Sequence, residues 1–175
     1  MFPLATVTGT ERGQTDRLLA EVAARLAAEG WALSGVVQVD TGQPGRARCD
    51  MDLRVLGRSD VVRISQNLGE QATGCRLDPD GLETAVGLVE TTLERRPRLL
   101  ILNKFGKAEI EGRGFRPLIG QALEQGIPVL MGLKALNRDG FDAFAQGMAQ
   151  TLPADLDAVL AWSRAIAAIE PLTFQ

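Results

Sequence analysis

The sequence has no histidine, no tyrosine and only two cysteines among its 175 residues. Without histidine, a Ser-His-Asp triad and a histidine-ligated metal site are both excluded. Cys49 and Cys75 are too few and too far apart for a zinc site of the CxxC type, and a disulfide between them is not expected in a reducing cytosol. Any catalysis must therefore depend on carboxylates, lysines, arginines, a thiol or a bound metal ion.

The chain also has no excess of positive charge and no long apolar run. The formal net charge of -3 argues against a general binder of nucleic acids or acidic membranes. No apolar run approaches the roughly 20 residues that a membrane-spanning helix needs. The first eight residues lack the basic region of a signal peptide and lead into a β-prone run, so we expect a cytoplasmic protein without membrane insertion. Any anion site must then be a local concentration of positive charge.

The pattern along the chain predicts one α/β domain spanning residues 1–175. Short β-prone runs at 4–8, 31–39, 99–102 and 127–131 alternate with helical patterns, the last of them at about 154–168. Two further runs, 51–56 and 61–65, alternate apolar and polar residues and predict a β-hairpin inserted at about 50–66, as an edge or a flap. This alternation predicts a mostly parallel sheet flanked by helices on both faces.

The first strand is followed by a glycine-bearing turn and a helix, which is the context of a phosphate-binding loop. The motif is degenerate: Thr8 stands where the first glycine belongs, and Gln14 replaces the lysine that reaches the phosphates. Arg12 is a partial substitute for the lost charge, although arginine does not have the reach of that lysine. The turn is thus either a phosphate-binding loop or merely structural. Its candidate anion-binding residues are Gly9, Arg12, Gly13, Gln14 and Thr15.

A charged loop follows the apolar run Leu99–Leu102, which has the composition of a buried parallel strand. Open α/β sheets bind their ligands where such strands end, so the loop is either a ligand site or an ordinary solvated connection. Its candidate anion-binding residues are Asn103, Lys104, Lys107 and Arg113. Glu109 and Glu111 are either internal ion-pair partners or, in the catalytic alternative, a general base. We expect this loop and the loop at 9–15 to converge on adjacent strand ends.

A third candidate is the polar, glycine-containing stretch from 66 to 78, because long loops without secondary structure are often functional. Cys75 and Arg76 lie just before a predicted helix that Asp78 caps, with Pro79 in its first position. A thiol near a helix N-terminus can have a lowered pKa, whereas the alternative for Cys75 is a small buried apolar residue.

Several motifs resemble those of a bacterial domain-of-unknown-function family, and the resemblance covers nearly the whole chain. The matching segments are 49–53, 64–69, 74–78 and, with the greatest specificity, 102–115. Members of that family are often encoded near molybdate-uptake genes, and some are labelled as molybdenum-transporter ATP-binding proteins. The chain is more distantly similar to the small P-loop nucleoside-triphosphatases of the thermophile type, which implies a P-loop-like fold. In that comparison, Asn103 and Lys104 occupy the two acidic Walker B positions, and Glu109 matches a later glutamate.

These departures bear on chemistry, because phosphoryl transfer needs its developing negative charge to be neutralised, usually by a P-loop lysine and a magnesium ion held by a Walker B acid. Lys104 would repel magnesium, so no metal site is predicted, and a nucleotide or an oxyanion is the expected ligand. The resemblance implies a role accessory to molybdate or metal homeostasis, and the departures predict a binding protein with little or no hydrolysis. One alternative is a divergent nucleoside-triphosphatase that uses Lys104 and either Glu109 or Glu111. The other is a regulatory, partner-binding protein of metal homeostasis that uses the hairpin and Cys49 or Cys75. Its partner is either a second copy or a transporter-associated protein.

Overall fold

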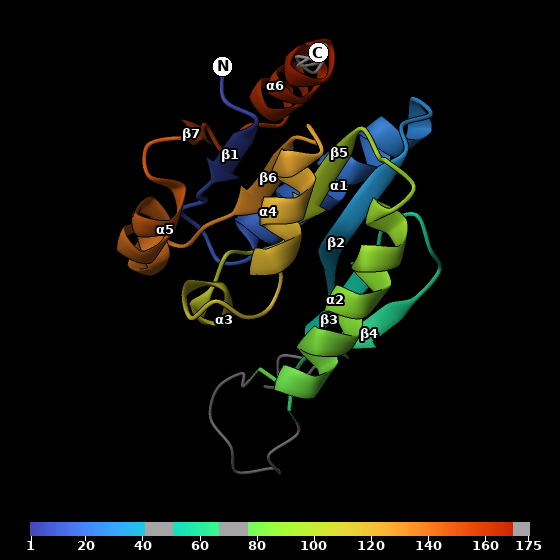
Figure 1. Cartoon of the computed structure of the whole chain (residues 1–175), viewed down its shortest axis with the longest axis vertical. Helices are drawn as coiled ribbons and strands as arrows, with labels where there is room; N and C mark the ends of the chain where they lie inside the picture. Colours follow the sequence, from blue (N-terminus) through green and yellow to red (C-terminus); the bar gives the residue numbers. More distant parts are fainter. Residues whose placement is uncertain (41–50, 67–76, 170–175) are drawn as a thin grey trace.

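The computed structural model describes residues 1–40, 51–66 and 77–169, in which seven strands form one sheet (Figure 1). Five strands run parallel in the spatial order β2-β5-β6-β1-β7. Their bounds are Leu4–Val7 for β1, Leu33–Asp40 for β2, Leu99–Leu102 for β5, Val129–Gly132 for β6 and Gln150–Leu152 for β7. The mostly parallel sheet that the sequence predicts is therefore confirmed.

The hairpin extends this sheet at one edge. Its strands are β3, Met51–Val55, and β4, Val61–Arg63, and β3 pairs antiparallel with β2. Because Val55 lies opposite Val36, the hairpin turn comes back to the end of the sheet where β2 begins. The carboxyl ends of the parallel strands are at the opposite end. The turn is thus part of an edge and not a flap over those ends.

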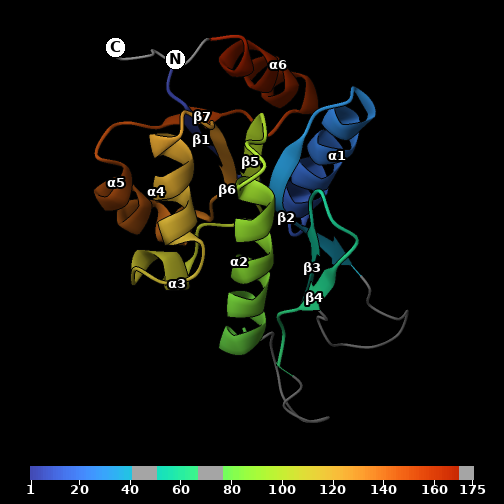
Figure 2. The same ribbon diagram turned by 45° about the vertical axis from the view of Figure 1, so that its right-hand side comes forward.

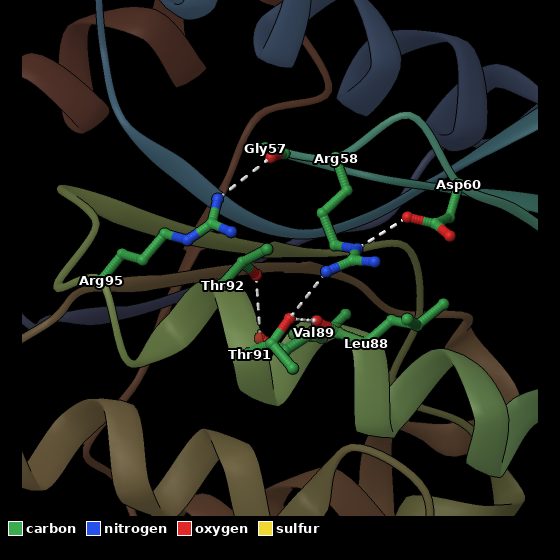
Figure 3. Close-up of polar contacts among 8 residues, drawn as sticks. All are labelled: Gly57, Arg58, Asp60, Leu88, Val89, Thr91, Thr92 and Arg95. Atoms are coloured by element: carbon green, nitrogen blue, oxygen red, sulfur yellow. Dashed lines mark hydrogen bonds and ion pairs between the residues drawn. The ribbon is translucent and has the colours of Figure 1, made fainter.

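Contacts with α2, Pro79–Leu93, hold this turn in place (Figure 3). The Arg58 guanidinium lies 2.6 Å from a carboxylate oxygen of Asp60 and also donates to the Thr91 hydroxyl at 3.4 Å. Arg95, just beyond the helix, donates to the carbonyl oxygen of Gly57 at 3.4 Å. The hairpin and α2 therefore form one supporting unit at the β4 edge.

Helices cover both faces of the sheet (Figures 1 and 2), as the alternating pattern predicts. On one face lie α1, Gln14–Ala28, and α6, Leu156–Ala167, while the other carries α2, α3, Lys107–Ile110, α4, Arg116–Glu124, and α5, Arg138–Ala145. Two apolar cores result. Within β5, Leu100 and Leu102 belong to the core under α2 and α4, whereas Leu99 and Ile101 belong to the core under α1 and α6. A strand buried on both faces explains the unbroken apolar run in the sequence.

The helix ends follow local chemistry that the sequence already displays. Asp78 caps α2 by accepting a hydrogen bond from the N–H of Asp80 at 3.1 Å, and Pro79 occupies the first helical position. Gly30 follows α1 with a φ of +84°, a conformation that glycine adopts without strain. The predicted start of α2 is confirmed.

Two short elements depart from the expected order. The first is β7, which pairs with β1 but spans only three residues. The second is α3, a single turn inside the segment that the sequence presents as a charged loop. Elements this short carry too few residues for a periodic signal, so tertiary contacts determine them. Within the described ranges, no helix combines the length and apolarity needed to cross a bilayer.

Candidate functional site

The candidate site lies where β1, β5 and β6 end. After β1, the chain turns through residues 8–13 into α1, and the Thr8 hydroxyl donates to the carbonyl oxygen of Leu133 at 2.7 Å. Gly13 precedes the helix with a φ of +74°. A side chain there would be strained by this backbone conformation, and its Cβ would lie 2.9 Å from the guanidinium of Arg17. The local strand–turn–helix therefore matches the expected context of an anion-binding loop.

The Gln14 side chain turns back into this loop. Its amide oxygen accepts hydrogen bonds from the N–H of Thr10 at 2.8 Å and from the N–H of Glu11 at 3.1 Å. The adjacent N–H of Gly9 donates to the Thr15 hydroxyl at 2.9 Å. Three consecutive backbone donors of the loop are thus bound by the protein's own side chains. Arg12, the proposed substitute for the missing lysine, is exposed.

Asn103 ends β5 and is almost fully buried at 5% exposure. Its side-chain NH₂ group donates to the Asp16 carboxylate at 3.1 Å and to the side-chain oxygen of Gln38 at 3.2 Å. Its oxygen accepts from the backbone N–H of Gln38 at 3.2 Å. The amide therefore joins β5 to β2 and α1. Sequence reasoning missed Asp16 and Gln38, although a polar residue in the first turn after a phosphate-loop motif was an available signal.

The expectation that the two loops sit on adjacent strands is wrong, because β6 lies between β1 and β5. The loops still meet, and Gly132 at the end of β6 is the reason. A Cβ at Gly132 would overlap the carbonyl oxygen of Asn103 and lie 2.9 Å from Cγ2 of Thr15. Because glycine has no side chain, α1 and the end of β5 close over β6.

Lys104 follows Asn103 and is partly buried. Burial lowers the pKa of its ammonium group, and the positive charge of Lys134 beyond β6 lowers it further, whereas Asp16 and Glu109 act in the opposite direction. In the part of the chain that the structure describes, the ammonium has no hydrogen bond and no ion pair within 4.0 Å. A partly desolvated cation of this kind favours an anionic ligand.

Glu109 is buried at 4% exposure and serves the backbone around it. Its two carboxylate oxygens accept from the N–H of Gly106 at 2.9 Å and from the N–H of Phe115 at 3.3 Å. Burial raises the pKa of this carboxyl, while these hydrogen bonds and the charge of Lys104 oppose the rise. A Cβ at Gly114 would overlap the carboxylate, so that glycine allows the loop to close around Glu109.

Glu111, Lys107 and Arg113 form a separate group on the exposed side of α3. Glu111 is paired with the Arg113 guanidinium and lies 3.9 Å from the Lys107 ammonium. The Arg113 hydrogen bond lowers the pKa of the Glu111 carboxyl. None of these three charges is among those that act on Lys104. The structure thus divides the candidate residues of this loop into two groups, with Asn103, Lys104 and Glu109 near the strand ends.

The donor set does not suit magnesium. Within residues 1–40, 51–66 and 77–169, no three acidic or cysteine side chains are grouped as metal ligands. Of the two carboxylates that act on Lys104, Glu109 accepts from backbone N–H groups and Asp16 accepts from Asn103 through one of its oxygens. The charges of Lys104 and Lys134 would oppose a divalent cation. Cys49, Cys75 and Arg76, the other residues that the sequence singles out, lie outside the described residues.

Comparison of the sequence with known proteins identifies its family. A model of the DUF2478 family, described as "Protein of unknown function", matches residues 4–162. The protein belongs to the DUF2478 family. The DUF2478 chain is also 30% identical over 161 residues to molybdenum import ATP-binding protein ModC 2 of Bradyrhizobium diazoefficiens. That alignment covers 92% of the chain but only 18% of the relative, so the chain spans less than a fifth of that protein.

A solved structure shows the same fold. THEP1 from the hyperthermophile Aquifex aeolicus superimposes with a TM-score of 0.67 over 95% of the DUF2478 chain and 99% of THEP1. The sequences are 15% identical, so the likeness concerns the fold alone. The chain thus has a P-loop-NTPase-like α/β fold with an inserted hairpin, as the sequence resemblance implies.

Proposed function

We propose that this protein binds a nucleotide or an oxyanion where β1, β5 and β6 end, and that it hydrolyses nucleoside triphosphates little or not at all. The observation that carries the proposal is Lys104. Its ammonium is partly buried and, among the described residues, has no ion-pair partner within 4.0 Å. An anion would supply the missing opposite charge, and Lys134 would add a second positive charge beside it.

The weakness of hydrolysis follows from how the acidic groups are used. Phosphoryl transfer relies on a metal ion that neutralises developing charge and on a group that positions the attacking water. The position of the Walker B acid holds Asn103, whose amide is committed to Asp16 and Gln38. Glu109 is buried against backbone N–H groups, and Glu111 is ion-paired on the surface. Neither glutamate therefore has a free carboxylate that could position the attacking water.

The named relative suggests a setting for this binding. ModC 2 is named as an ATP-binding protein of molybdenum import, and the matched region is a small part of it. We therefore propose a role accessory to molybdate or metal homeostasis, in which the ligand is either a nucleotide or the oxyanion itself. The binding role does not depend on that setting, since it rests on the charge at Lys104.

Isothermal titration calorimetry with ATP, GTP, phosphate and molybdate, each with and without magnesium, tests the proposal. We expect at least one of these ligands to bind, and Lys104→Ala to lose that binding. Lys107→Ala is the matched control, because this lysine is 87% exposed and is paired with Glu111, so its affinity should equal that of the wild type. Absence of binding to all four ligands would refute the proposal.

Phosphate release in the presence of ATP or GTP separates binding from hydrolysis. We expect no release above a protein-free control. Release that Glu109→Gln abolishes, in a variant that still binds the nucleotide, would instead support the alternative of a divergent nucleoside-triphosphatase.

A further inference from the structure

The loop between β1 and α1 holds a hydrogen-bond acceptor that the protein itself supplies. Gln14 is the first residue of α1, and its side-chain oxygen receives the N–H groups of Thr10 and Glu11 at 2.8 and 3.1 Å. The Thr10 hydroxyl approaches the same oxygen at 3.5 Å. One acceptor atom therefore gathers donors from two successive residues, which is what an oxygen atom of a bound anion does in such a loop.

We propose that Gln14 is an internal competitor of the ligand, whose amide oxygen must leave the loop before an anion can bind there. The inference rests on the proposed function and specifies its regulation. In the position of the usual lysine, an acceptor has taken the place of a donor. A P-loop lysine at this position attracts a phosphate. The Gln14 side chain instead accepts the backbone N–H groups that a bound phosphate would accept.

The competition favours strongly charged ligands. Hydrogen bonds to an ionised acceptor are roughly twice as strong as those to a neutral amide, so a phosphate-like dianion can displace the Gln14 oxygen. A neutral or weakly accepting ligand gains little by the same exchange. The positive charge of Lys104 adds to this preference from the end of β5. The ligand class that the site selects is accordingly a doubly charged oxyanion or the terminal phosphate of a nucleotide.

Displacement of the glutamine need not disturb the helix. Thr15 separately binds the N–H of Gly9, and the first main-chain hydrogen bond of α1, from Arg17 to the carbonyl oxygen of Gly13, involves no side chain of Gln14. The glutamine can therefore swing out while the turn and α1 persist. We therefore expect an oxygen of the anion to replace the Gln14 side-chain oxygen while the backbone of the loop stays in place.

Two substitutions of Gln14 should change the affinity for inorganic phosphate in opposite directions. Gln14→Ala removes the competitor, and we expect phosphate to bind about tenfold more tightly, as for the loss of one or two neutral hydrogen bonds. Gln14→Glu keeps the acceptor and adds a negative charge, and we expect it to bind phosphate at least about tenfold more weakly. The second variant is expected to fold, because an acidic residue at a helix N-terminus is favourable. Gln125→Ala, at an exposed position after α4, is the control with unchanged affinity.

Amide hydrogen exchange tests the geometry without any ligand. The Thr10 and Glu11 amides should exchange faster in Gln14→Ala than in the wild type, whereas the Gly9 amide, held by Thr15, should not change. Unchanged exchange at both amides would overturn the internal contact itself.

The outcomes separate the two proposals. If the wild type binds phosphate and Lys104→Ala does not, but Gln14→Ala binds equally or more weakly, the competitor is refuted and the proposed function stands. If neither the wild type nor Gln14→Ala binds any of the four ligands, both are refuted. Binding that rises in Gln14→Ala and falls in Gln14→Glu supports both.

Discussion

Replacing Lys104 with methionine should make the protein more stable and at the same time remove anion binding. Methionine is unbranched like the lysine stem, which lies along Gly106, where a Cβ would be 3.7 Å from Cγ of Lys104. The substitution therefore keeps the packing of the stem and removes the charge. Residues that serve a ligand commonly cost stability in the free protein.

The magnitude follows from the surroundings of the ammonium. Burial and the like charge of Lys134 disfavour the charged form, while Asp16 and Glu109 offset part of that cost. Because Lys104 is only partly buried, water also reduces the penalty, so we expect a gain of about 1 kcal/mol in the free energy of unfolding. For a chain of this length, that corresponds to roughly 2–4 °C in Tm.

The gain should also depend on pH. The lowered pKa means that the unfolded chain holds its proton to higher pH than the folded protein does. The penalty of the wild type is then complete below the pKa of the folded state and disappears as the pH rises toward the ordinary lysine value of about 10.4. The advantage of Lys104→Met should shrink over the same interval.

Urea denaturation at neutral and alkaline pH, combined with phosphate titration, measures both effects. Lys107→Met is the matched control, expected to change stability by less than about 0.5 kcal/mol because this side chain is exposed. A loss of more than about 1 kcal/mol in Lys104→Met would show that the ammonium makes a stabilising interaction. Unchanged phosphate affinity in a stabilised variant would show that the lysine is not the anion ligand.

Two other substitutions test the support of the site. Gly132→Ala should lower the free energy of unfolding by about 1–3 kcal/mol in urea denaturation, because the new methyl group overlaps the Asn103 carbonyl and crowds Thr15. The control Gly120→Ala lies in open space on α4 and should stabilise the protein slightly. Equal effects of the two substitutions would contradict the close approach at Gly132. For Glu109, the raised pKa means that the folded state takes up a proton at higher pH than the unfolded chain, so the wild type should gain stability relative to Glu109→Gln as the pH falls toward about 4.3. A stability difference between these two proteins that does not vary with pH would be evidence against the raised pKa.

The site and its scaffold have separate physical requirements. The scaffold needs buried strands and a glycine at the end of β6, and the chain keeps both. The polar groups near the strand ends serve other contacts: Asn103 donates to Asp16 and Gln38, and the Gln14 side-chain oxygen accepts from Thr10 and Glu11. A P-loop-like fold therefore does not by itself fix the chemistry of the residues at its strand ends.

Much of the fold could be predicted because its signals are local. The unbroken apolar run Leu99–Leu102 indicates a strand covered on both faces, and the pair Asp78 and Pro79 marks a helix start, since each depends on a few neighbouring residues. The hairpin is visible in its alternating pattern, and its pairing with β2 follows once one face is buried. In contrast, β7 is too short to show a period, and only its register beside β1 makes it a strand.

The sequence by itself determined the strand–turn–helix order, and it placed Gln14 after the first turn and Asn103 and Lys104 after a buried strand, because these are matters of residue type and spacing. Only the tertiary structure decided that β6 separates the two loops, that Gly132 lets them meet, and that Lys107 and Arg113 pair with Glu111 while Lys104 does not. It also decided that Gln14 turns into the loop as an acceptor. The physical reason is that charge, burial and hydrogen bonding depend on distances between residues far apart in the chain, and those distances exist only after the sheet has formed.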